Sequence, residues 1–128
     1  MTKVVVDSDI IIDFLRTGSG LLPALFESQR DGKLELFLSA ITILELFAGK
    51  SSKAAAGQLR ELITGFTVVP LGNELAIFAG ELKRDHRIST AFADLVVGAA
   101  TIAIGAQLAT RNKRHYQGIP KLRFYPLL

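Results

Sequence analysis

The feature that most constrains this chain is the alternation of short β-branched apolar runs with longer segments of helical periodicity. The first run, Val4-Val5-Val6, is apolar throughout, which is typical of a strand buried on both faces of a parallel sheet and predicts a central position. No Asn-Gly turn joins two apolar runs, so the pattern favours a parallel α/β sheet. Strands are expected at residues 3–6, 34–38, 66–69, 107–109 and 122–125, and helices at residues 10–15, 21–30, 40–48, 52–63, 73–84 and about 90–104.

Composition limits the class of protein. The chain has 128 residues, no cysteine and 49% hydrophobic residues, which indicates one domain over residues 1–128 and excludes a disordered chain or a cysteine-based scaffold. The longest apolar stretch, residues 95–106, is shorter than the ~20 residues that a membrane-spanning helix needs, and no signal-peptide pattern opens the chain. We therefore expect a soluble cytoplasmic protein with no membrane partner.

Charge is unevenly distributed although the net charge is only +3. Asp94 is the last acidic residue, and five basic residues follow it: Arg111, Lys113, Arg114, Lys121 and Arg123. A basic end suits a polyanion such as RNA, because neutralised phosphates release counterions; a merely solvated basic surface is the alternative. Three aromatic residues in this segment could stack on bases, although core packing is the commoner role: Tyr116, Phe124 and Tyr125.

Three acidic residues stand where apolar neighbours make a carboxylate costly. Asp7 directly follows the first strand, Glu45 lies in a helix that is apolar nearly all round and therefore expected to be buried, and Asp94 lies early in the long apolar helix. Each has a structural alternative. Asp7 could cap a helix, although Asp9 is expected to do so; Glu45 could pair with a lysine at the solvent edge; Asp94 could interact with the helix dipole.

The carboxyl ends of parallel strands form one crevice, and these acids could meet there together with Thr110, Arg111 and Asn112. Carboxylates brought together repel one another unless a divalent cation neutralises them. An all-oxygen site suits a hard cation, so Mg²⁺ is expected, with Mn²⁺ able to substitute. Such an ion meets its substrate through phosphate oxygens, which points to phosphoryl chemistry.

Three stretches of the chain resemble, in order, the three blocks of the PIN-domain nucleases, and most closely the VapC-type toxins of toxin–antitoxin pairs: VVVDSDIIIDFL, SAITILELFAG and ADLVVGAATIAIGAQLATRNKRHY. The resemblance covers nearly the whole chain. It implies a three-layer α/β/α PIN-like domain with a parallel sheet of four or five strands, and Mg²⁺-dependent endoribonuclease activity on RNA.

The resemblance also implies roles for particular residues and partners. The acids of the family, which bind metal and support catalysis, fall on Asp7, Glu45 and Asp94. Substrate contacts fall on Ser8, Thr110, Arg111 and Asn112. The implied partners are RNA, a small cognate VapB-like antitoxin whose tail occupies the acidic crevice, and a second copy of the chain in a homodimer.

The chain departs from the family pattern at two positions. Asn112 stands where many relatives carry an aspartate, so a fourth carboxylate is missing there. Asp9 stands where an asparagine is frequent; it could add negative charge or cap the helix. Asp13, one turn later, is expected to be solvated.

Two other functions remain open from the sequence. The missing carboxylate would suit a degenerate PIN fold that binds RNA or protein without cutting it. Asp7-Ser8-Asp9 also resembles the Asp-x-Asp motif of phosphatases in which the first aspartate is the nucleophile, but that family needs acids late in the chain and none follows Asp94.

Overall fold

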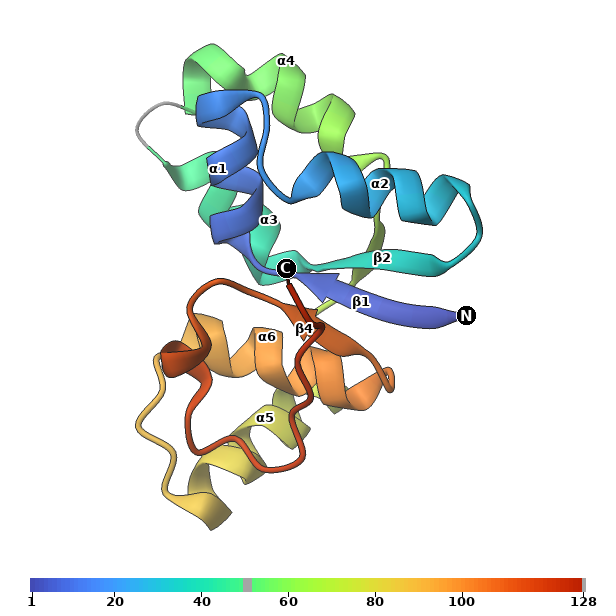
Figure 1. Ribbon diagram of the computed structural model, residues 1–128. Helices are drawn as coiled ribbons and strands as arrows, with labels where there is room; N and C mark the ends of the chain where they lie inside the picture. Colours follow the sequence, from blue (N-terminus) through green and yellow to red (C-terminus); the bar gives the residue numbers. More distant parts are fainter. Residues whose placement is uncertain (50–51, 128) are drawn as a thin grey trace.

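The computed structural model describes residues 1–49 and 52–127, and shows a four-stranded parallel sheet between two layers of helices (Figure 1). The strand order is β3-β2-β1-β4, so β1 is interior, as predicted. In chain order the elements are β1 (Thr2–Val6), α1 (Ser8–Thr17), α2 (Leu22–Arg30), β2 (Leu34–Ser39), α3 (Ala40–Ala48), α4 (Ser52–Ile63), β3 (Thr67–Val69), α5 (Asn73–His86), α6 (Phe92–Ala103), β4 (Gln107–Ala109) and a 3₁₀ turn, η1 (Lys113–Tyr116).

Each face of the sheet carries its own hydrophobic core. Successive side chains of a strand point to opposite faces. Accordingly, Val5 packs in the core formed with α5 and α6, whereas Val4 and Val6 pack in the core formed with α1 and α2. All three valines are fully buried, which explains the unbroken apolar run of β1. Figure 1 shows the two helical layers, and the predicted three-layer α/β fold is confirmed.

The expected fifth strand at residues 122–125 does not form, and the prediction of that strand was wrong. Phe124 makes one isolated parallel bridge with Leu108. The bridge consists of two backbone hydrogen bonds, from Leu108 N–H to the Arg123 carbonyl at 2.9 Å and from Tyr125 N–H to the Leu108 carbonyl at 2.8 Å. Pro126 follows at once and has no N–H to extend the ladder.

The long helix of the third motif begins later than expected. α6 starts at Phe92 after Ala91, without a side-chain cap, whereas the predicted start was about residue 90. Thr90 is buried, and its hydroxyl donates to the Gln117 carbonyl at 3.4 Å. The Thr90 side chain therefore connects to the segment after η1 instead of capping α6. No helix of the described residues is long and apolar enough to cross a membrane.

Gly98 lets α6 approach the segment that follows β4. A Cβ placed at Gly98 would lie 2.7 Å from Ile119 Cδ1 and 3.7 Å from Tyr116 Cδ1. Both neighbours are buried, so little space exists for adjustment. A glycine at this position therefore serves close packing, and the contact fixes η1 and the segment after it beside α6.

Gly98→Ala should lower the free energy of unfolding by about 1–3 kcal/mol, because the added methyl group overpacks this contact. Gly80→Ala is the matched control: Gly80 also lies inside a helix, but nothing lies within 4 Å of its Cβ position. It should raise stability by about 0.4–1 kcal/mol through the unfolded state. Urea unfolding of the two variants measures these changes in the free energy of unfolding. If both substitutions changed it in the same direction, the packing role of Gly98 would be contradicted.

Candidate active site

Asp7 lies at the carboxyl end of β1 and is 5% exposed. Its Oδ1 accepts the Ser8 N–H at 2.8 Å, which makes Asp7 the N-cap of α1, and its Oδ2 accepts the Thr110 hydroxyl at 2.8 Å. The prediction that Asp9 is the cap was wrong, because the helix already begins at Ser8. The Asp7 carboxylate is thus held by two hydrogen bonds in a fixed orientation.

Thr110 takes its position from the sheet. β1 and β4 pair in parallel with Val6 opposite Ala109, so the residues that follow them, Asp7 and Thr110, come side by side. The Thr110 hydroxyl, besides donating to Asp7, accepts the Asn112 N–H at 3.0 Å. The expected meeting of the two strand ends is therefore confirmed by direct hydrogen bonds.

Asp94 and Glu45 approach the same region from two helices. Asp94 lies in the first turn of α6, partly buried, with Oδ2 3.7 Å from His115 Nδ1. Glu45 lies in α3 and is exposed, so the prediction that this apolar helix is buried all round was wrong. Only one side of α3 is covered: Thr42 and Leu46 are buried, whereas Leu44 is 61% exposed.

The carboxylates influence one another electrostatically. The pKa of Glu45 is raised by partial burial and then by the charges of Asp94 and Asp7. The pKa of Asp94 is raised by burial and then by Asp7, while His115 opposes the shift. The pKa of Asp9 is raised by burial and then by Asp7. The charge of Asp7 therefore acts on three other acids, one in each of α1, α3 and α6.

The donor set suits a hydrated hard cation. Within residues 1–49 and 52–127, no three acidic or histidine side chains lie close enough to enclose an ion by themselves. Mg²⁺ seldom needs such a cage, because it keeps several waters and binds through one or two carboxylates plus substrate phosphates. Asp9 Oδ1 is buried without a hydrogen-bond partner among these residues, so one carboxylate oxygen remains unsatisfied. These observations fit a divalent ion that arrives with its water.

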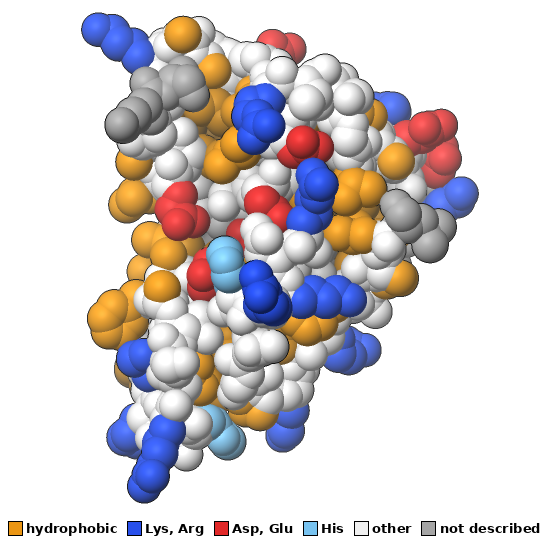
Figure 2. Space-filling model, turned by 60° about the vertical axis from the view of Figure 1, so that its left-hand side comes forward, with side chains coloured by type: hydrophobic (Ala, Val, Ile, Leu, Met, Phe, Trp, Pro, Cys, Tyr) orange, Lys and Arg blue, Asp and Glu red, His pale blue; other side chains and the backbone are white. Residues whose placement is uncertain are grey.

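Three adjoining hollows lie along the elements that carry these residues, and Glu45 and Asp9 each line one of them. One of about 430 Å³ is lined by Glu45, Ile12 and Arg16 among others; one of about 370 Å³ shares Ile12 and Arg16 and reaches Arg111 and Asn112. The third, of about 360 Å³, is lined by residues 110–115. Figure 2 shows acidic side chains gathered at the middle of this face, with basic side chains and a histidine beside them.

The other predicted residues are placed as follows. Ser8 contributes its backbone N–H to Asp7. Arg111 is exposed, and its guanidinium lies 3.3 Å from the Asp13 carboxylate. Asp13 is thus ion-paired, and it is also partly buried, so it is not freely solvated as predicted. Asn112 is exposed and donates from its side chain to Asp9 at 3.2 Å.

Tyr116 is a component that the sequence analysis missed. Its ring is part of the core, with 2% exposure, so it is not available for stacking on a base. Burial raises the pKa of Tyr116 far above its ordinary value, and the charges of Asp7 and Asp94, which act on its hydroxyl, raise this pKa further. No sequence pattern distinguishes a tyrosine that places its hydroxyl among acids from one that only fills a core.

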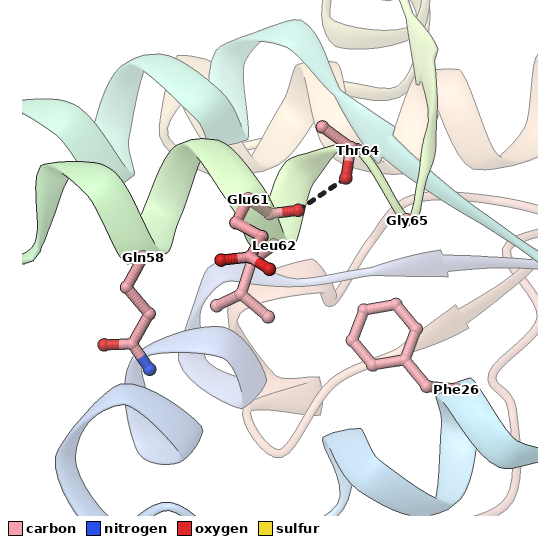
Figure 3. Close-up of a pocket in the computed structure, with 6 residues that line it drawn as sticks. All are labelled: Phe26, Gln58, Glu61, Leu62, Thr64 and Gly65. Carbon is pink, nitrogen blue, oxygen red and sulfur yellow. Dashed lines mark hydrogen bonds between the residues drawn. The ribbon is translucent and has the colours of Figure 1, made fainter.

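A further pocket of about 350 Å³ lies apart from the acids, beside the end of α4 (Figure 3). The Thr64 hydroxyl in its wall donates to the Glu61 carbonyl at 2.6 Å. Its lining is Phe26, Gln58, Glu61, Leu62, Thr64 and Gly65. Glu61 is its only ionisable group, so this pocket lacks converging groups for catalysis.

Comparisons with known proteins agree with the fold. The family model described as PIN domain matches residues 4–119. Ribonuclease VapC10 of Mycobacterium tuberculosis is 28% identical over 123 residues, which are 94% of this chain and 90% of that protein. The structure of DNA-bound VapBC from Salmonella typhimurium aligns over 98% of each chain with a TM-score of 0.83 at 17% identity. A toxin–antitoxin complex from Klebsiella pneumoniae aligns over 97% of this chain and 99% of that one, with a TM-score of 0.72 at 20% identity.

Thr110→Val should lower the free energy of unfolding of the metal-free protein by about 2–3 kcal/mol, because it leaves the buried Asp7 Oδ2 and the Asn112 N–H without a partner. Thr110→Ser keeps the hydroxyl and should cost about 1 kcal/mol, the value of one buried methyl group. Urea unfolding of both variants tests this. Equal losses would show that the hydroxyl does not hold Asp7.

Proposed function

The chain belongs to the PIN-domain family, and from that premise we propose that it is a metal-dependent endoribonuclease that acts as the toxin of a toxin–antitoxin pair. The observation that carries the proposal is that Asp7, held in one orientation by the Ser8 N–H and the Thr110 hydroxyl, lies near enough to Glu45 and Asp94 for its charge to act on both. The ribonuclease name of the relative VapC10 and the VapBC titles of the structural neighbours support it.

We assign Asp7, Glu45 and Asp94 to the binding of Mg²⁺, with Mn²⁺ able to replace it. When bound, the ion lowers the pKa of a coordinated water and stabilises charge on the phosphate. Asp7 supplies the fixed ligand, since both of its oxygens are oriented by hydrogen bonds. Glu45 is exposed and lines the hollow of about 430 Å³, so its side chain can turn toward an incoming ion.

The residues after β4 suit the RNA backbone. Arg111, Lys113 and Arg114 are exposed and line the hollow of about 360 Å³ that adjoins the acids. Their positive charges would hold phosphates on either side of the scissile bond. Ser8 contributes through its backbone to Asp7, and Thr110 acts by orienting Asp7, so for these two we propose positioning instead of direct substrate contact.

Protein partners form the second part of the proposal. The hollow between α1, α3 and α4 is lined by the apolar residues Ile12, Leu15, Leu46 and Leu59. An amphipathic segment of a small antitoxin would bury its apolar side there. Phe92 and Leu44, which are 73% and 61% exposed, provide apolar surface for a homodimer.

Asp7→Asn, Glu45→Gln and Asp94→Asn should each lower kcat/KM for RNA cleavage by at least about 100-fold, because a bound metal contributes several kcal/mol and each 1.4 kcal/mol is tenfold in rate. Cleavage is measured with Mg²⁺ or Mn²⁺ and again with a chelator, which should abolish it. Asp85→Asn is the control, since Asp85 is exposed and pairs only with Arg84 among the contacts described. Full activity in both Asp7→Asn and Glu45→Gln would refute the assignment, and an inactive wild-type chain that also binds no Mn²⁺ would indicate a degenerate fold.

Expression of the chain alone should arrest growth of a bacterial host, and co-expression of the small protein encoded beside its gene should relieve the arrest. The physical reason is that an occupied α1–α3–α4 hollow places the partner next to Glu45 and excludes RNA. Asp7→Asn should abolish the arrest without the partner. Arrest by Asp7→Asn at wild-type levels would separate toxicity from cleavage and contradict this role.

A further inference from the structure

A hollow of about 540 Å³, which we call the α1–α2 hollow, lies beside the loop that joins α1 to α2; residues 13, 17, 19–21, 110, 111 and 127 line it. It shares Arg111 with the two narrower hollows of about 370 Å³ and 360 Å³. It also shares Thr110 with the proposed active site, because the Thr110 hydroxyl orients Asp7. A ligand in the α1–α2 hollow would therefore be a direct neighbour of RNA held at that site.

The lining of the α1–α2 hollow combines apolar surface with a few polar groups. Leu21 and Leu127 are partly buried and pack against the core on this side of the sheet, and their remaining surface is apolar. Asp13, Ser19 and Arg111 add a carboxylate, a hydroxyl and a guanidinium. Sites for small ligands have this composition and volumes of about 300–1,000 Å³. The flat apolar face and polar edge of an unpaired nucleobase match such a lining.

Gly20 leaves the space that the Asp13 carboxylate occupies beside the hollow. A Cβ at Gly20 would collide with Asp13 Oδ2, and its φ of +89° lies in the left-handed region. The Arg111 guanidinium lies 3.3 Å from the same oxygen, and the Asp13 side chain is 25% exposed. The carboxylate is thus held by contacts on two elements while part of it stays open to a ligand.

Hydrogen bonds around Thr17 hold the α1–α2 loop in one conformation. Thr17 Oγ1 donates to the Asp13 carbonyl at 2.9 Å. It accepts the Ser19 N–H at 3.1 Å and the Ser19 hydroxyl at 3.2 Å. The loop is therefore tied to the turn of α1 that carries Asp13. A preorganised wall of this kind loses less conformational entropy when a ligand binds.

The carboxylate of Asp13 distinguishes between the four bases of RNA. An ionised carboxylate has two oxygens that only accept hydrogen bonds. On the Watson–Crick edge, guanine presents two adjacent N–H donors, at N1 and at the N2 amino group. Uracil presents one donor between two acceptors, and adenine and cytosine present an amino group beside an acceptor. A carboxylate at the edge of the hollow therefore complements guanine.

We propose that the α1–α2 hollow is a base-binding subsite for an unpaired guanine of RNA, with Asp13 as the group that accepts hydrogen bonds from the guanine N1–H and N2–H. Gly20 is a positioning residue, because it leaves room for the Asp13 carboxylate. This inference rests on the proposed function and deepens it by giving the RNA substrate a base preference.

The test is the binding of fluorescently labelled uridine hexanucleotides in which one uridine is replaced by guanosine or by inosine, at each position in turn. Inosine lacks only the N2 amino group of guanosine. Fluorescence anisotropy is measured at low salt with a chelator, so that no cleavage occurs. At one position or more, the full chain should bind the guanosine RNA at least about 5-fold more tightly than the inosine RNA, the effect of a hydrogen bond to a charged acceptor.

The ratio of these two affinities is the readout for the variants, because removing a negative charge changes the affinity for both RNAs alike. Asp13→Ala should bring the ratio to below about 2-fold, since it removes the acceptor. Gly20→Ala should lower the ratio as well, because the added methyl group displaces the Asp13 carboxylate. Gly18→Ala is the matched control: Gly18 has a φ of +70°, but nothing lies within 4 Å of its Cβ position, so the ratio should stay at the wild-type value.

Equal affinities of the wild type for the guanosine and inosine RNAs at every position overturn the inference, as does a wild-type ratio in Asp13→Ala. A ratio that Gly18→Ala and Gly20→Ala lower equally overturns the positioning role of Gly20. If Gly20→Ala does not fold, Asp13→Ala decides alone, and Asp13→Ser replaces Asp13→Ala should that variant not fold. Equal affinities for the two RNAs, with amide NMR signals of residues 17–21 that shift only when the small protein encoded beside the gene is added, would assign the hollow to a protein partner instead.

The binding measurement needs no cleavage, which separates this inference from the proposed function. If the wild type cleaves RNA with Mg²⁺, Asp7→Asn does not, and guanosine and inosine RNAs bind equally, only the guanine subsite fails. If the guanosine RNA is preferred but neither Mg²⁺ nor Mn²⁺ supports cleavage, the nuclease activity fails and the subsite stands.

Discussion

The hydrogen bond from the Thr110 hydroxyl to the Asp7 carboxylate is the contact on which the arrangement of the site depends. It joins residues 103 positions apart in the chain, at the ends of two neighbouring parallel strands. Because the bond is buried, no water competes for either partner, and the carboxylate keeps one orientation. The same carboxylate starts α1, so one side chain sets the position of a strand end, a helix and the loop after β4.

At neutral pH the charged acids of the site lower the stability of the folded chain. For Glu45, Asp94 and Asp9 the folded-state pKa lies above the ordinary value, so the folded chain holds these protons more tightly than the unfolded chain. Their contribution to stability is therefore fully present below the ordinary carboxyl pKa and is lost as the pH rises through the raised values. The two apolar cores on the sheet faces compensate for this loss, which lets the chain keep unneutralised carboxylates in one region.

The fold follows closely from local sequence patterns, whereas the site follows only in part. Apolar runs and helical periodicity are patterns of neighbouring residues, so β1 and the helices could be predicted. The single bridge at Phe124, which Pro126 ends, and the exposure of Glu45 on the uncovered side of α3 depend on how distant segments pack. Tyr116 is the clearest case, because its place near Asp7 and Asp94 comes from tertiary packing, and the sequence does not distinguish it from a tyrosine that only fills a core.

Under the proposed function, the binding of a divalent cation and the binding of RNA would be coupled. The acids would repel an RNA backbone, while the basic residues in the hollow lined by residues 110–115 would attract it. Arg111 and Asn112 line both that hollow and the one that Asp9 lines. A divalent ion beside the acids would remove the repulsion, and an RNA phosphate would supply oxygen ligands that the carboxylates, which do not enclose an ion by themselves among the described residues, do not supply. Each ligand would then favour the binding of the other by the same coupling free energy.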